Sequence, residues 1–349
     1  MIKKVTVLSL ALAIFTSFAG LNEVIAKESI ANDSTKNTQL EKHQLFGVLK
    51  ARSEYDLGDN LFRFSVRNSR VGLKGQLTSA VNYQTQVELS SNGSFKVLDL
   101  YATVNIAEGL SLTMGQGGLP IYNNYTVSPG NLMFANRPFI GKFFTGSREI
   151  GATAKYTFHI NEFPIAIEAG LYNGGEINKP QWTDNPSYAA RLMAGGNKGF
   201  RVSAKAYRYP FSELEDYAIW GADLRYEAPS WKVETEWLNM HNYADESALS
   251  SYYLQGGYVI PCRIGELFDH LLPAARWDAM GYDITENGFQ VNRLTLGLGF
   301  GLTQKAFSSI VRLDYELYNI PEEDIAAVAT RFPGENFNDK LTLELLIIF

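Results

Sequence analysis

The sequence has 349 residues, 46% of them hydrophobic, which is enough to build a packed core and excludes overall disorder. Aromatic residues reach 13% and glycines number 30, a composition that favours β structure over a helical membrane bundle or an average soluble enzyme. The single cysteine, Cys262, permits no disulfide within the chain, and 4 scattered histidines disfavour a zinc centre, so no metal or cofactor is expected. A formal net charge of -6 does not indicate a nucleic-acid-binding protein.

The N-terminus has the pattern of a secretory signal peptide over residues 1–26. Lys3 and Lys4 form its charged region, residues 5–18 its apolar region, and residues 24–26 a small-residue cleavage site. The apolar run is shorter than the about 20 residues that a transmembrane anchor needs. The sequence therefore predicts export from the cytoplasm and removal of this segment.

The exported chain divides into two parts. Residues 27–44 form a polar leader to which no chemistry is assigned, and residues 45–349 form the folded part. Cleavage at Ala19 or Gly20 instead of at the predicted site stays open.

From residue 45 onward, segments of about ten residues alternate apolar with polar or small side chains. Over 81–89, valine, tyrosine, threonine and leucine hold the odd positions, whereas asparagine, glutamine and glutamate hold the even ones. The last segment, 340–349, alternates in the same way but less cleanly. Sixteen strands are predicted, at 45–55, 68–77, 81–89, 97–106, 110–115, 148–158, 163–172, 187–194, 200–207, 217–226, 231–238, 251–260, 271–282, 293–302, 307–317 and 340–349.

The connections between these strands alternate in length. The gaps after even-numbered strands are short, at 78–80, 107–109, 159–162, 195–199, 227–230 and 303–306, with 261–270 as a longer exception. Those after most odd-numbered strands are long, including 116–147, 173–186, 239–250 and 318–339. This asymmetry is typical of an outer-membrane barrel with tight periplasmic turns, and a soluble β-sandwich does not show it.

The polarity of the two strand faces indicates the surroundings. Sixteen strands enclose a lumen too wide for side chains to fill, so the polar face must line water and the apolar face must contact lipid. Closed pairing satisfies every backbone donor and acceptor within the hydrocarbon. The chain ends on Phe349, which resembles the C-terminal signal recognised by the barrel assembly machinery. We therefore expect a closed antiparallel transmembrane β-barrel in the outer membrane of a Gram-negative bacterium.

Acidic and basic residues are near balance on the predicted inward faces, and pairing across strands explains most of them. The segment 116–147 is different, because it contains no Asp or Glu and is rich in aromatic and apolar residues. Such a third loop is too apolar for water, so we expect it to fold into the barrel and narrow the pore. The alternative is a surface loop that caps a contact between subunits.

The bases on this loop and on the wall then form the predicted anion path. Clustered positive charge at a constriction raises the local concentration of anions. The predicted path consists of Arg137, Lys142 and Arg148 on the inner loop and Arg191, Arg201, Lys205, Arg276 and Arg312 on the wall.

Several motifs resemble those of the phosphate-selective porins O and P, and the similarity covers most of the mature chain. The central ones are Gly115-Gln116, Leu119-Pro120-Ile121-Tyr122, Ser128-Pro129-Gly130-Asn131-Leu132 with Phe134, Arg137-Pro138 and Arg148-Glu149-Ile150-Gly151. Later ones are Tyr188-Ala189-Ala190-Arg191-Leu192, Tyr253-Leu254-Gln255-Gly256-Gly257-Tyr258 and Pro273-Ala274-Ala275-Arg276-Trp277-Asp278. The resemblance implies a homotrimeric channel with an inward third loop and basic pore residues. Gly118 stands where that family often has a lysine, which weakens the inference of phosphate as the solute.

Two other functions compete with an anion channel. A general diffusion porin without ion preference is favoured by the balanced lumen and by Gly118. A barrel hydrolase needs an activated nucleophile beside a histidine, for which His241 and His270 are the only candidates. Sixteen strands exceed the size of such enzymes, and the leader is too short to plug the barrel of an energy-coupled receptor.

Overall fold

The computed structural model describes residues 43–66, 68–89, 93–123, 129–140, 142–144, 146–175, 177–196, 198–210, 216–305 and 308–349. The predicted signal peptide and leader, up to residue 42, lie outside the described residues, as does Ser128 of the central motifs. The first strand begins at His43, two residues before the start expected from the sequence.

Eighteen strands are described, and their alternating patterns explain why these residues are extended. They are β1 (His43–Asp56), β2 (Leu61–Val66), β3 (Ser69–Gln76), β4 (Val81–Leu89), β5 (Phe95–Ala107), β6 (Leu110–Gly118), β7 (Arg148–Ile160), β8 (Phe163–Tyr172), β9 (Ser187–Gly195), β10 (Gly199–Pro210), β11 (Asp216–Glu227), β12 (Trp231–Asn242), β13 (Ala248–Tyr258), β14 (Ile260–Ile264), β15 (Phe268–Tyr282), β16 (Val291–Gly301), β17 (Ile310–Asn319) and β18 (Lys340–Ile348).

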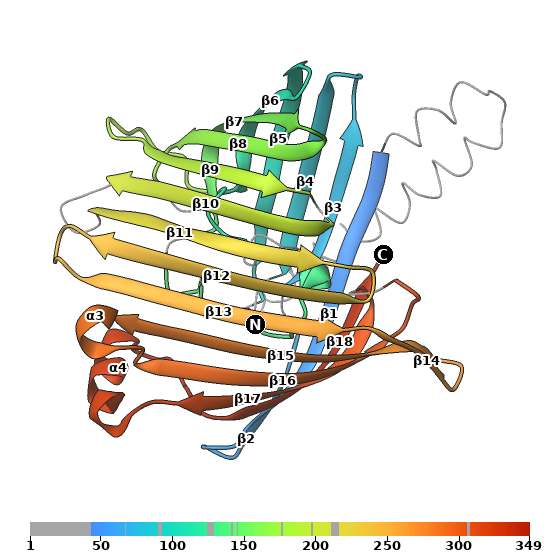
Figure 1. Ribbon diagram of the computed structural model, residues 1–349, viewed down its shortest axis with the longest axis vertical. Helices are drawn as coiled ribbons and strands as arrows, with labels where there is room; N and C mark the ends of the chain where they lie inside the picture. Colours follow the sequence, from blue (N-terminus) through green and yellow to red (C-terminus); the bar gives the residue numbers. More distant parts are fainter. Residues whose placement is uncertain are drawn as a thin grey trace, which may run out of the picture.

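Of these eighteen described strands, 16 close into one antiparallel ring. In Figure 1, strands β9 to β17 run side by side across the view, and each pairs with its neighbour along the chain except that β13 pairs directly with β15. The ring closes between β1 and β18, in a register that places Val48 opposite Ile348 and Asp56 opposite Lys340. The predicted closed antiparallel barrel of about sixteen strands is confirmed.

The two remaining strands extend the wall beyond the ring. Strand β2 pairs with residues 51–56 of β1, whereas β3 pairs with residues 43–48 of the same strand. Strand β14 pairs with the start of β15 and accounts for the long gap at 261–270. Because β14 is an edge strand, it tolerates Pro261, which has no amide to donate. The sequence pattern did not predict either strand.

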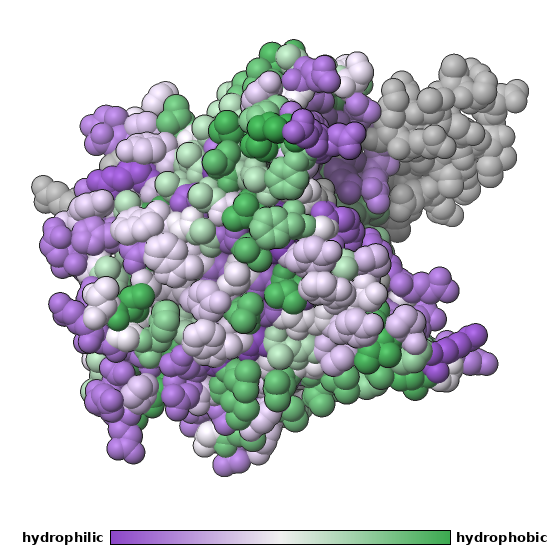
Figure 2. All heavy atoms as spheres, viewed as in Figure 1, coloured by the Kyte–Doolittle hydropathy of each residue, from purple (hydrophilic) through white to green (hydrophobic). Residues whose placement is uncertain are grey.

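The alternation of faces is confirmed. On β18, Leu341, Leu343 and Leu345 are 39%, 49% and 40% exposed, whereas Thr342 and Glu344 are fully buried. In Figure 2, hydrophilic side chains gather along the left and right edges of the visible face, with more apolar ones between them. The outside therefore presents an apolar band, and the lumen holds the charges.

The connections differ at the two rims. We call the rim with 119–147, 173–186 and 320–339 the long-loop rim, and the opposite rim, with turns such as 108–109 and 161–162, the short-turn rim. The long-loop rim also carries the described helical segments α3 (Ile284–Asn287), η2 (Glu322–Asp324) and α4 (Ile325–Arg331), and the inner loop carries η1 (Pro129–Asn131). No helix in the described part of the chain is long and apolar enough to cross a membrane.

Two predicted connections have the wrong length. Strands β12 and β13 extend further than expected, so the gap predicted at 239–250 shrinks to 243–247, closed by a bond from the Asn242 amide to the Ser247 carbonyl. The connection predicted at 303–306 is too short, because β16 ends at Gly301 and β17 begins only at Ile310. Inward packing of Met240 and Leu249, which lie beyond the predicted ends of the two strands, explains the longer strands, because it continues the wall toward the long-loop rim.

Candidate functional site

Between β6 and β7, the described residues 119–123, 129–140, 142–144 and 146–147 lie inside the ring, against its inward-facing wall. Leu119, Ile121, Tyr122 and Ile140 are buried in a cluster with inward-facing wall residues of β8 to β13, such as Tyr253. Burial removes these four side chains from water, which is the physical reason for expecting an inward loop from the sequence. The loop covers one side of the wall and leaves the side formed by β3 to β7 open to the passage.

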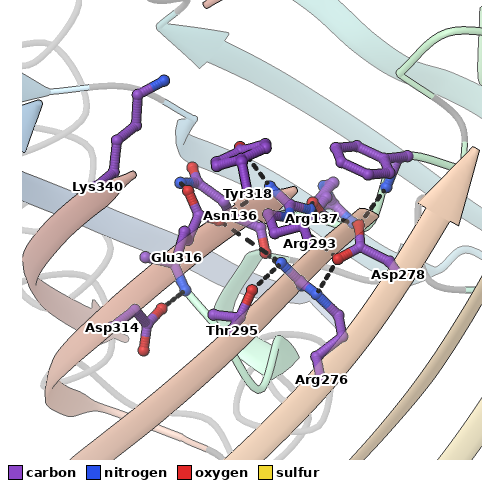
Figure 3. Close-up of polar contacts among 12 residues, drawn as sticks. Asn136, Arg137, Arg276, Asp278, Arg293, Thr295, Asp314, Glu316, Tyr318 and Lys340 are labelled. Carbon is purple, nitrogen blue, oxygen red and sulfur yellow. Dashed lines mark hydrogen bonds and ion pairs between the residues drawn. The ribbon is translucent and has the colours of Figure 1, made fainter. Parts of the chain in front are cut away.

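Wall cations hold the loop by its backbone carbonyl groups. Arg312 donates to the Leu132 carbonyl at 2.6 Å, and Arg52 donates to that of Ala135 at 3.0 Å. In Figure 3, the side chains of Arg276 and Arg293 point toward the loop residues Asn136 and Arg137. They donate to the carbonyl groups of these two residues at 2.8 Å each.

Wall carboxylates hold the loop by its amide groups. Asp314 accepts a bond from the Ala135 amide at 2.6 Å, and Asp278 accepts one from the Phe139 amide at 3.0 Å. Glu236 accepts a bond from the Asn123 amide at 2.7 Å, on the other arm of the loop. The loop backbone is therefore fixed by charged groups of both signs, and charge-assisted bonds of this kind are stronger than neutral ones. We call this set of wall side chains the loop frame.

Three predicted members of the anion path do not face water. Arg276 and Arg312 are each 1% exposed and belong to the loop frame, with Arg276 3.3 Å from Asp278. Lys205 is buried between Asp223 and Glu236, at 2.7 Å and 2.5 Å. The inner loop lies over the wall that carries these three bases, so the structure does not place them on the surface of the passage, and their part in an anion path stays a prediction.

The other five predicted bases also have partners. Arg148 pairs with Asp99 at 2.8 Å, and Arg191 pairs with Glu168 at 2.5 Å. Arg201 is 3.6 Å from Asp223 and donates to Asn123 of the loop. Arg137 lies in the loop, and Figure 3 shows it beside Arg293.

Lys142 is half-exposed and 2.5 Å from Glu335 of the 320–339 loop. Burial lowers the pKa of the Lys142 ammonium group, and the Glu335 carboxylate partly offsets this effect.

Three cavities among the described residues follow the lumen. The first, of about 370 Å³, lies at the long-loop rim between the inner loop and β1, β17 and the 320–339 loop. The second, of about 600 Å³, lies between the inner loop and β3 to β5, and Arg137 lines both. The third, of about 340 Å³, shares Glu149 with the second and extends along β5 to β9. Of the predicted path, Arg137, Lys142, Arg148 and Arg191 line these cavities.

Several lining bases were not predicted as site residues. Lys50, Arg52 and Arg70 hold inward positions that alternation could identify, but nothing in the sequence ranks them above other inward bases. Arg63 lies on β2, which the sequence pattern missed, and Lys96 lies where β5 starts earlier than expected.

The comparisons with known proteins agree with this geometry at the level of the fold. No protein family and no curated protein matches the chain by sequence. Among solved structures, Salmonella typhi OmpF in complex with daunomycin superposes with a TM-score of 0.61 at 13% identity, over 88% of this chain and 97% of that chain. The outer-membrane channel DcaP of Acinetobacter baumannii superposes with a TM-score of 0.56 at 12% identity, over 88% of this chain and 97% of that chain. A further porin structure superposes with a TM-score of 0.53 at 14% identity, over 88% of this chain and 100% of that chain.

The chain has the porin fold. At these identities the similarity concerns the fold alone, and membership of the phosphate-selective O and P family stays a prediction.

The two histidines considered for a hydrolase lie at opposite rims of this porin fold. His241, near the end of β12, is 3.4 Å from Glu246 at the long-loop rim. His270, near the start of β15, packs against Gly301 at the short-turn rim. No group of three or more His, Cys, Asp or Glu side chains in the described residues is placed to hold a metal ion.

Proposed function

We propose that the protein is an outer-membrane porin through which small hydrophilic solutes diffuse passively, with a preference for anions. The observation that carries the proposal is a closed ring with an apolar outside and a charged lumen, in which an inner loop leaves successive cavities. Lipid surrounds such a wall, and water fills such a lumen. The channel requires no cofactor.

The charge of the first cavity supports the preference for anions. Its acidic lining residues are Glu54, Glu316 and Glu335. Its basic lining residues are more numerous: Lys50, Arg52, Arg63, Arg137, Lys142, Arg293 and Lys340. A surplus of one sign in a low-dielectric cleft focuses the field and concentrates counter-ions, here anions such as phosphate.

The extent of ion pairing favours a second candidate, a general diffusion porin. Arg148, Arg191 and Lys142 each have a carboxylate within 3 Å. A paired base contributes less net field than a free one, so a weakly selective channel is the alternative.

Reversal potential decides between the two candidates. In a planar bilayer with a KCl gradient, we expect the wild type to prefer chloride over potassium. Arg137→Glu combined with Lys142→Glu should shift the reversal potential toward cation preference, because both positions line the first cavity. Lys305→Glu, on an exposed residue of the short-turn rim, should change it little. An unchanged potential in the double variant would leave the general porin as the better description.

The proposed orientation places the long-loop rim outside the cell and the short-turn rim in the periplasm, after removal of the signal peptide. Cys262, the chain's single cysteine, tests this arrangement, because it lies on β14 at the short-turn rim. A membrane-impermeant maleimide should not label it in intact cells and should label it after the outer membrane is permeabilised. In the variant Cys262→Ser combined with Ala244→Cys, the new cysteine lies in the exposed 243–247 connection of the long-loop rim and should be labelled in intact cells. Labelling of the wild-type Cys262 in intact cells would show that the orientation is the reverse of the proposed one.

We also propose a homotrimer inserted by the barrel assembly machinery. The in-vitro folded OmpT of Vibrio cholerae, which shares the fold at a TM-score of 0.53, is described as a trimer. The mass of the protein extracted in mild detergent tests this assembly.

A further inference from the structure

The second cavity has two unlike walls. Strands β3 to β5 and the start of β7 present charged side chains to it, among them Arg70, Lys96 and Arg148. The rings of Tyr209, Tyr217 and Phe144 come from the end of β10, the start of β11 and the returning arm of the inner loop. A cavity of about 600 Å³ is within the usual range for sites that enclose a small organic molecule.

The ring wall is built and held in place. Tyr209 and Tyr217 stack with centroids 4.7 Å apart and an interplanar angle of 13°. The Tyr209 hydroxyl donates to the Gly174 carbonyl at 2.9 Å, which fixes this buried ring, while Tyr217 stays partly exposed. Phe144 packs against both apolar clusters of the inner loop. The three side chains are therefore already held in place, so a ligand that stacks against them pays little conformational entropy for ordering the site.

The charged wall carries a surplus of bases. Arg70 pairs with Glu88 at 2.6 Å, and Arg148 pairs with Asp99 at 2.8 Å. Lys96 is exposed and forms no ion pair with any residue that the structure describes.

Glu149 also lines the cavity, but its carboxylate is already engaged. It accepts bonds from Tyr207, from Ser187 at 2.8 Å and from the Gly174 amide at 3.0 Å. A negative group in the cavity would therefore meet Lys96 and Arg137 before any unengaged carboxylate.

We propose that the second cavity is a binding site for aromatic carboxylates, with the ring against Tyr217 and Phe144 and the carboxylate toward Lys96 and Arg137. The proposal rests on the porin function above and names a solute class for it. Inorganic phosphate would pair with the basic side chains but would make no contact with the aromatic rings. A neutral sugar would leave the excess positive charge without a counter-ion. An aromatic anion uses both walls.

Block of the KCl current by added solutes measures this binding in planar bilayers. Benzoate is compared with cyclohexanecarboxylate, which has the same charge and nearly the same size but no aromatic ring, and with neutral benzamide. Ring stacking should make the dissociation constant of benzoate roughly threefold to tenfold lower than that of cyclohexanecarboxylate. Benzamide should block least. Equal block by the two carboxylates would overturn the proposal.

Two variants distinguish the contribution of the aromatic wall to binding from that of the charged wall. Tyr217→Leu should abolish the difference between benzoate and cyclohexanecarboxylate, whereas Lys96→Gln should weaken both carboxylates by a similar factor and preserve their ratio. Tyr188→Leu, on the lipid-facing surface, should leave both constants unchanged. Phe144→Leu is a second test of the ring wall, and heat-modifiable migration verifies folding of each variant. A ratio that persists in both ring variants would overturn the proposal.

The failure of this inference is distinct from the failure of the proposed function. A wild-type protein that folds but conducts no current would refute the porin itself. A conducting channel whose current does not distinguish benzoate from cyclohexanecarboxylate would refute only the binding site.

Discussion

Arg293→Met should lower the free energy of unfolding by roughly 3 kcal/mol, which is expected when one partner is removed from a buried ion pair. The guanidinium group is 2.6 Å from Asp278 and 2.9 Å from Glu316, and it also donates to the Arg137 carbonyl. Methionine replaces the bulk over Phe139 but removes the nearest cation from both carboxylates. Asp278 keeps its bond from the Phe139 amide and Glu316 keeps its bond from the Asn136 side chain, but their remaining cation, Arg276, is farther away, at 3.3 Å and 3.7 Å. Urea titration of the protein refolded in phospholipid vesicles measures the loss.

The same variant should also make the open-channel current noisier, because the inner loop loses the bond at Arg137 that fixes it beside the passage. The matched control is Lys198→Met, which breaks the exposed pair with Glu227 at the short-turn rim and should cost less than about 1 kcal/mol. If Arg293→Met is as stable and as quiet as the control, the loop frame does not hold the loop.

Phe349→Asp should reduce the folded protein in the outer membrane about tenfold while export to the periplasm continues. The last residue closes the ring: its carbonyl accepts a bond from the Gly47 amide at 2.9 Å, and its amide donates to the Gly47 carbonyl at 3.1 Å. The phenyl ring of Phe349 lies over Gly47, where an added Cβ atom would be 2.1 Å from that phenyl ring. An acidic residue near the rim of a barrel costs only about 0–1 kcal/mol, which is too little for a tenfold loss. A large effect in cells therefore indicates failed recognition by the assembly machinery.

Refolding into vesicles without that machinery separates the two causes. Phe349→Asp should refold there to nearly the wild-type yield, and Phe349→Tyr should assemble almost normally in cells. Gly47→Ala, which only obliges the Phe349 ring to turn, should have a smaller effect than Phe349→Asp. If the yield of Phe349→Asp falls equally in vesicles and in cells, the residue acts through stability and the assembly signal is refuted.

The barrel could be predicted because its information is local. Period-two alternation sets which face of each strand is apolar, and this pattern was correct in β4 and β18, where Gln86, Glu88 and Glu344 are buried and face inward. Strands β2 and β14 were missed because they have only six and five residues, fewer than the segments of about ten residues that the pattern predicts. Strand β2 does alternate, with Phe62, Phe64 and Val66 against Arg63 and Ser65. Both strands form by pairing with neighbours, which a single segment does not reveal.

The site was predicted less well because it depends on contacts between distant residues. The acid-free composition of 116–147 identified the inner loop, but it did not show which wall the loop covers. Arg276 and Arg312 were predicted as pore residues on the strength of charge and alternation, yet both donate to loop carbonyls. Charge type and face follow from local sequence, whereas exposure to the passage follows from where the loop packs.

The seam between β1 and β18 also has a consequence for biogenesis. Its partners, such as Val48 and Ile348, lie about as far apart in the described chain as two residues can. Joining ends separated by about 300 residues has an entropic cost on the order of 5 kcal/mol, and this seam is available only when β18 is present. Every shorter intermediate has two open strand edges, which are templates for aggregation. A chain that stops before β18 would therefore gain no partial barrel function and would be a substrate for periplasmic proteolysis.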